Sequence, residues 1–160
     1  MKRKRALALA LAVLTLLALI TGCAASPKTS DNNGFVIGLS SYSLTNSWRV
    51  QLEAEFVQRA DELKADGVIS EYYITNANDD LTKQISDIRD LMTKGCNAIL
   101  VDALSADGLN DVCEEAMENG IVVISFDDVI TSDKITAKVH SDNYEFGRQC
   151  GISGKRVKGR

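Results

Sequence analysis

The stretch that decides the fold runs from residue 81 to residue 125 and reads LTKQISDIRDLMTKGCNAILVDALSADGLNDVCEEAMENGIVVIS. Its first part has apolar residues at the spacing of one helical face over 81–92 and, after a Lys-Gly pair, the short apolar run 98–101. The second part repeats this order, with a helical pattern over 109–117 and, after an Asn-Gly pair, the apolar run 121–125. The stretch therefore predicts two successive units in which a helix ends at a glycine and leads into a strand.

The same alternation continues on both sides of this stretch. Apolar or β-rich runs predict strands at 35–39, 68–74 and 136–139, and helical patterns occupy 48–65 and 144–153. Strands that read as continuous apolar runs between helices are typical of a parallel sheet covered on both faces. Because crossovers between parallel strands are right-handed, the sequence predicts an α/β fold with a doubly wound parallel sheet.

The N-terminus carries the pattern of an export signal. Four basic residues, Lys2 to Arg5, precede an apolar run over 6–20, which is shorter than the roughly 20 residues of a membrane-spanning helix. The run ends in Leu-Ile-Thr-Gly-Cys at Cys23, which resembles the lipobox of bacterial lipoproteins. That resemblance implies a signal peptide over 1–22, a lipid-modified Cys23 and a flexible tether over 23–34; an ordinary secreted protein cleaved nearby is the alternative.

Charge and cysteine usage exclude several classes of protein. Removal of residues 1–22 deletes four of the 18 cations and none of the 22 acids, so the mature charge is 14 − 22 = −8. A nucleic-acid partner is not expected, because such binders cluster basic residues on one face. Cys96, Cys113 and Cys150 show neither metal-ligand nor redox spacing, and the first two fall on apolar faces as small buried hydrophobes.

Polar and aromatic residues follow each predicted strand, and the carboxyl ends of parallel strands meet at one edge of a sheet. The candidate ligand-binding residues among them are Tyr42, Asn46, Trp48, Arg49, Asp102 and Asp127. Carboxylates accept charge-assisted hydrogen bonds from neighbouring hydroxyls, and an aromatic ring covers the apolar face of a sugar. The edge is therefore predicted to bind a hydroxyl-rich small molecule.

Some of the residues that follow the strands also have an ordinary structural interpretation. Asp79 or Asp80 can cap the helix that starts near Leu81, Asp102 can cap its own loop, and Trp48 can belong to the core. No Ser-His-acid arrangement, nucleophile elbow or metal-spaced histidine pair occurs, so we expect no catalytic residues, no metal and no cofactor. An exported hydrolase that uses Asp127 or Asp102 remains a distant alternative.

An ordered set of short motifs between about residues 35 and 154 resembles type I periplasmic sugar-binding proteins, the ribose-binding-protein-like receptors of ABC importers. The motifs are Ile37-Gly38-Leu39-Ser40, Asn46-Ser47-Trp48-Arg49, Asn76-Ala77-Asn78, Lys94 to Ile99, Gly120 to Val123 and Ser141-Asp142-Asn143. The resemblance implies two lobes joined by a hinge, with ligand clamped between them. It places ligand contacts at Asn46, Trp48, Arg49 and Asp127, and the hinge at Asp142. Tyr42 and Asp102 are added from their loop positions.

This sequence also departs from the family pattern. Arg49 replaces an aromatic residue and can instead bind a hydroxyl or an anionic group. Asp128 stands where ribose receptors often have arginine, which argues against ribose itself and leaves a polyol as the expected ligand. The resemblance implies a first lobe over 35–141 and the start of a second lobe over 142–160, in a truncated product or a partial sequence. It implies a lipoprotein on the outer face of the cytoplasmic membrane, or in the periplasm, that serves an ABC importer permease. A receptor that signals to a membrane kinase or chemoreceptor is the alternative.

Overall fold

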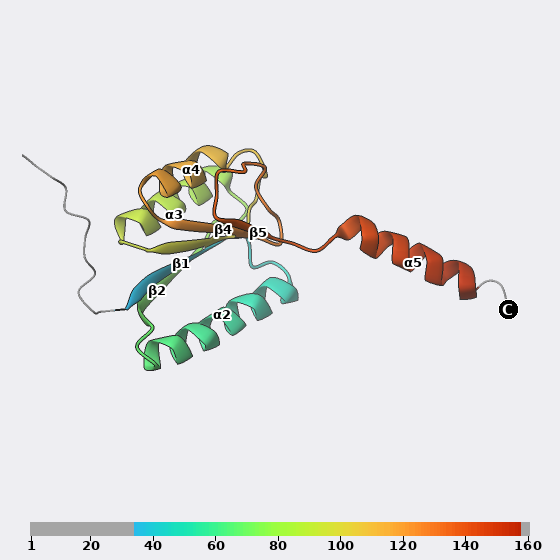
Figure 1. The fold of residues 1–160 in the computed structure, drawn as a ribbon, viewed down its shortest axis with the longest axis horizontal. Helices are drawn as coiled ribbons and strands as arrows, with labels where there is room; N and C mark the ends of the chain where they lie inside the picture. Colours follow the sequence, from blue (N-terminus) through green and yellow to red (C-terminus); the bar gives the residue numbers. More distant parts are fainter. Residues whose placement is uncertain (1–33, 158–160) are drawn as a thin grey trace, which may run out of the picture. The chain divides into compact units, whose positions relative to one another are not determined.

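A five-stranded, all-parallel sheet forms the centre of the chain in the computed structural model, which describes residues 34–157 (Figure 1). The strands are β1 (Phe35–Ser41), β2 (Ile69–Asn76), β3 (Ala98–Val101), β4 (Val122–Phe126) and β5 (Ala137–Val139), in the spatial order β2-β1-β3-β4-β5. The helices are α2 (Ser47–Ala65), α3 (Leu81–Thr93), α4 (Asn110–Glu118) and α5 (Asn143–Val157). The predicted α/β class with a parallel sheet is confirmed.

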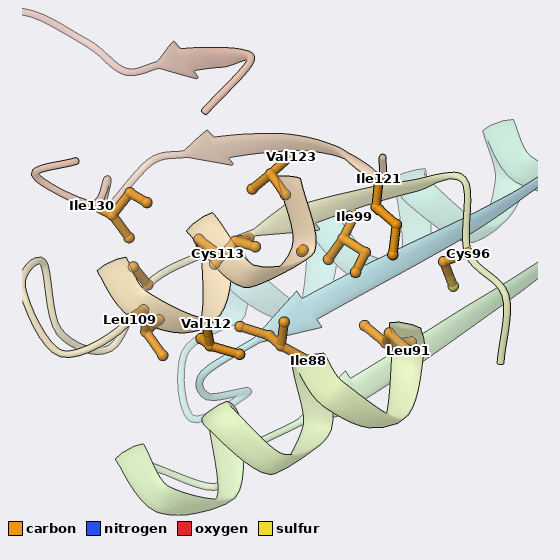
Figure 2. Packing of buried hydrophobic residues seen from close by; sticks show 13 residues of the cluster. Ile88, Leu91, Cys96, Ile99, Leu109, Val112, Cys113, Ile121, Val123 and Ile130 are labelled. Carbon is orange, nitrogen blue, oxygen red and sulfur yellow. The ribbon is translucent and has the colours of Figure 1, made fainter. Parts of the chain in front are cut away.

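Helices cover both faces of the sheet (Figure 1): α3 and α4 pack together on one face, and α2 lies on the other. A buried hydrophobic cluster lies under α3 and α4, where Ile88 and Leu91 meet Val112 of α4 and Ile99 of β3 (Figure 2). Each fully buried aliphatic side chain contributes about 1.5–3 kcal/mol, so this layer supplies much of the stability. Cys96 and Cys113 are buried here, as predicted.

The glycines at 95 and 120 end α3 and α4 as the sequence predicted. Gly95 and Gly120 have φ angles of +79° and +77°, in the left-handed region that side chains disfavour. The N–H of Gly95 donates to the Met92 carbonyl and that of Gly120 to the Met117 carbonyl, so each glycine helps to close its helix. The chain can then turn directly into β3 or β4.

The strands β1 and β2 run further than the apolar pattern predicted. Both continue into polar residues, because parallel pairing joins Ser40 to Thr75 and Ser41 to Asn76. Backbone hydrogen bonds do not require apolar side chains, and Ser40 and Ser41 are nevertheless buried. The extension brings the polar residues that follow these strands to one common edge of the sheet.

Several predictions from the N-terminal sequence lie outside the described residues. These are the signal peptide over 1–22, the lipid-modified Cys23 and the tether up to residue 33. Within residues 34–157, every helix is too short or too polar to cross a lipid bilayer.

Candidate functional site

The candidate site lies at the carboxyl ends of β1, β3 and β4. The chain leaves β1 toward β2 on one side, and β3 pairs with β1 on the other, so the strand order reverses between β1 and β3. Ligands of open α/β sheets bind outside the strand ends at such a switch point. Tyr42 follows β1 here, Asp102 follows β3, and Asp127 and Asp128 follow β4.

Arg49 is the centre of the site. The side chain of Asn46 accepts a hydrogen bond from the Arg49 N–H at 2.9 Å, which caps α2 and fixes Arg49 in its first turn. The guanidinium lies 3.0 Å from Asp102 Oδ2, 3.5 Å from Asp127 Oδ2 and 3.1 Å from Asp128 Oδ2. We call these four charged residues the arginine–aspartate cluster. Because it contains three carboxylates and one guanidinium, the cluster has a net formal charge of −2.

Two aromatic rings flank the guanidinium. The Arg49 Cζ lies 4.1 Å from the centroid of the Tyr42 ring and 5.7 Å from that of the Trp48 ring, both within cation–π range. The Tyr42 hydroxyl donates to Asp128 Oδ2 at 3.2 Å. Trp48 is 51% exposed, so it is a surface residue and not part of the core. An accessible aromatic ring therefore stands beside the charged groups.

Burial divides the cluster into a hidden and an accessible part. Asp102 is 1% exposed, whereas the side chains of Asp127 and Asp128 are 39% and 60% exposed. One oxygen of Asp102, Oδ1, has no hydrogen-bond partner within the described chain. Burial raises the pKa of Asp102 to about 6, although the hydrogen bond and charge of Arg49 act against the shift. Burial is the largest single influence on the pKa of Arg49 and lowers it, but the hydrogen bond and charge of Asp102, together with the charges of Tyr42 and Asp127, outweigh burial and raise this pKa.

Backbone hydrogen bonds tie the strand-end loops together. The Ala103 N–H donates to the Asp128 carbonyl at 2.9 Å, and the Asp127 N–H donates to the Val139 carbonyl at 3.0 Å. Asp127 has a φ of +57°, which is uncommon for a residue with a side chain and marks a tightly determined turn. The carboxylates after β3 and β4 are therefore held in a fixed relation to each other.

The polar residues after β2 mainly serve the local chain. The Asp80 side chain accepts from the Lys83 N–H and caps α3, which confirms one of the predicted roles. Asn78 and Asp79 both have positive φ, and the Asp79 N–H donates to the Tyr42 carbonyl at 2.9 Å. These residues form a turn that holds in place the loop between β1 and α2, which contains Tyr42.

The structure brings most of the predicted binding residues around one guanidinium. Asn46, Trp48 and Asp127 each contact Arg49, and Tyr42 and Asp102 do so as well. Asp142 is not among these contacts: its side chain accepts from the Glu145 N–H at 2.9 Å at the start of α5. Its assignment to a hinge stays a prediction.

Sequence reasoning missed the ion-pair cluster itself. The signal was the like-charged pair Asp127-Asp128, which needs a nearby cation, and Arg49 was the cation among the strand-end residues. A buried carboxylate, such as that of Asp102, is kept charged only when it is paired. Arg49, predicted as a direct ligand contact, has a side chain that is only 10% exposed and directs its nitrogens to carboxylates.

A separate apolar cavity of about 380 Å³ lies between α2 and the sheet, lined by residues that include Phe35, Ile37, Phe56 and Leu100. Its wall includes Phe35 and Ile69, which begin β1 and β2, at the opposite end of the strands from the arginine–aspartate cluster. Its lining is almost wholly apolar, so it does not suit a polyol. The binding of a hydroxyl-rich molecule that the sequence predicts is therefore expected at the carboxyl ends of the strands and not in this cavity.

Comparison with known proteins agrees with this fold. Residues 37–153 match the family described as "Periplasmic binding protein domain". The chain belongs to this family. A ribose import binding protein of Bacillus subtilis (strain 168) is 32% identical, over 92% of this chain and 50% of that protein. A D-xylose-binding periplasmic protein of Haemophilus influenzae is 28% identical, over 92% of this chain and 42% of that protein.

Among solved structures, this periplasmic binding protein chain is similar to a fructose-binding periplasmic domain of a hybrid two-component system. That domain is 35% identical with a TM-score of 0.67, and the match covers 79% of this chain and 41% of the other. The chain therefore spans about half the length of the curated relatives it matches, and its sheet corresponds to part of the two-lobed type I fold.

Proposed function

We propose that this chain supplies the first lobe of a solute-binding lipoprotein that captures a sugar or related polyol outside the membrane and delivers it to an ABC importer. The observation that carries the proposal is the strand-end site. It combines an exposed Trp48, the partly exposed carboxylates of Asp127 and Asp128, and a buried oxygen of Asp102 that has no hydrogen-bond partner within residues 34–157. Carboxylates and an aromatic ring are the groups that bind the hydroxyls and the apolar face of a sugar.

Binding without chemistry is the role that this arrangement favours. Asp102, Asp127 and Asp128 are paired with Arg49, so none of them stands free as a base beside a nucleophile. The related proteins are named for the sugars that they bind, which supports a binding protein over an enzyme. A sensing receptor is the second candidate, since the fructose-binding relative belongs to a hybrid two-component system. Neighbouring genes for a permease and ATPase, or for a kinase, separate the two.

The proposal is tested by titrating the 160-residue chain with D-ribose, D-xylose and D-fructose and recording ¹H–¹⁵N spectra. Because the proposed clamp needs a second lobe, we expect dissociation constants weaker than about 1 mM. The shifts are expected at the Trp48 indole and at the Asp127 and Asp128 amides. Asp127→Asn is expected to remove them, and Asp133→Asn, an exposed aspartate paired with Lys138, is the matched control.

Two results would count against this reading. Micromolar affinity of the single lobe would contradict the two-lobe clamp. The absence of any shift near Trp48 with all three sugars, up to about 100 mM, would contradict a sugar site at this edge.

Lipid anchoring at Cys23 is proposed from the lipobox-like ending of the apolar run. In a bacterial host, the chain is expected to fractionate with membranes and to incorporate labelled palmitate. Cys23→Ala is expected to lose the label, since one thiol carries the diacylglyceryl group. Cys150→Ala, which removes an exposed cysteine on α5, is the control and is expected to keep it. Label retained in Cys23→Ala would refute the anchor.

A further inference from the structure

Gln84 is a fully buried polar residue on the apolar side of α3. It lies one turn before Ile88 and two turns before Leu91, both of which belong to the core. Gln84 itself is 0% exposed. A buried amide costs stability unless its donors and acceptor are paired, so its partners show what it does.

The partners of Gln84 belong to the ends of β1 and β3. Its Nε2 donates to the Asp102 carbonyl at 2.7 Å, and its Oε1 accepts from the Leu104 N–H at 3.0 Å. A weaker contact at 3.4 Å joins Nε2 to Ser40 Oγ at the end of β1. The carbonyl requires a donor and the N–H requires an acceptor, so the chemistry fixes the orientation of the amide.

We propose that Gln84 is a positioning residue that clamps the segment from Asp102 to Leu104 and so holds the Asp102 carboxylate against Arg49. The inference rests on the proposed function only in taking Asp102 as part of the ligand site. The other two N–H groups of the segment are also paired. The Asp102 N–H donates to the Ser40 carbonyl and the Ala103 N–H to the Asp128 carbonyl, so Gln84 pairs the third N–H, that of Leu104, and the Asp102 carbonyl.

Glutamine suits this position for a simple chemical reason. Its terminal amide presents a donor and an acceptor in one plane, and the carbonyl of residue 102 and the N–H of residue 104 need this pair. Methionine has a similar length and no hydrogen-bonding pair. Asparagine has the pair but is one methylene too short to reach both groups from α3. Both substitutions are neutral, so neither adds a charge beside Arg49, Asp127, Asp128 or Tyr42.

The experiment measures hydrogen exchange of the Arg49 Nε–H, which donates to Asp102 Oδ2 at 3.0 Å. In Gln84→Met this exchange is expected to accelerate by about tenfold or more, because two lost hydrogen bonds let the Asp102 segment open. The backbone amides of Leu91 and Ile99 measure the stability of the core, and their hydrogen exchange is expected to stay as slow as in the unsubstituted chain. Gln51→Met removes an exposed glutamine from α2 and is the control. It is expected to change neither the exchange of the Arg49 Nε–H nor that of the core amides.

Gln84→Asn is measured in the same way, so that a poorly folded methionine variant does not decide the matter. Faster exchange at Arg49 with an unchanged core in either variant supports the clamp. Unchanged exchange at Arg49 in a folded variant overturns it. Loss of folding in both variants also overturns it, since Gln84 would then support the fold as a whole. The readout needs no sugar, so failure of the sugar titration leaves it intact.

Discussion

Replacing Arg49 with methionine is expected to lower the free energy of unfolding at pH 7.5 by about 3–5 kcal/mol. The substitution keeps an unbranched apolar stem but leaves the buried carboxylate of Asp102 without its cation, and leaves Asp127 and Asp128 beside it. An uncompensated buried charge costs more than the net value of the pair that it belonged to. Urea unfolding followed by circular dichroism measures the loss.

The matched control lies on the same helix. Arg59 pairs with Glu62 at 2.8 Å, but both side chains are exposed, so Arg59→Met is expected to cost less than about 0.5 kcal/mol. The loss in Arg49→Met is also expected to shrink at about pH 5, where protonation of Asp102 removes the unpaired charge. Equal losses for Arg49→Met and Arg59→Met would show that the cluster has no special energetic role.

The α/β class and the order of elements could be predicted because their causes are local. Apolar periodicity and the glycines that end α3 and α4 are visible in the sequence, and the structure confirms both. The sequence predicted β1 and β2 to end too early. The pairing of Ser41 with Asn76 extends both strands, but both residues are polar and so do not continue the apolar pattern from which the strands were predicted. Pattern reasoning therefore locates elements better than it locates their ends.

The site was predicted as a set of residues but not as a network. Strand-end position alone identified Asp102, Asp127 and Trp48, since the topology of a parallel sheet gathers these positions. It could not show that Arg49 turns inward to join the carboxylates, because that depends on the cap by Asn46 and on burial. Gln84 was missed because it looks like a polar interruption of the α3 stripe, and its partners lie 18 and 20 residues along the chain.

The stability of the chain is expected to fall by about 1.5 kcal/mol between about pH 4.5 and pH 6 and by less than about 0.5 kcal/mol from there to about pH 7.5. Asp102 is the cause, because its pKa is about 6 in the folded chain and its ordinary value is 3.8. A carboxyl whose pKa is higher in the folded state binds its proton more tightly there. The stabilisation that the protonated Asp102 contributes to the folded state is therefore complete below pH 3.8 and is lost as the pH rises through about 6.

This pH range begins at about 4.5 because carboxylates that pair with basic side chains change the stability in the opposite direction at lower pH. Hydrogen bonds to basic side chains lower the pKa of Glu62, Glu114 and Asp133, so their contribution is lost on acidification. Asp102→Asn is expected to flatten the profile between about pH 4.5 and 6, since no buried charge then forms. Asp133→Asn is the control, and its stability is expected to fall between about pH 4.5 and 6 as in the unsubstituted chain. A profile that rises with pH in the unsubstituted chain, or a fall that persists in Asp102→Asn, would mean that Arg49 stabilises the Asp102 carboxylate more than burial destabilises it.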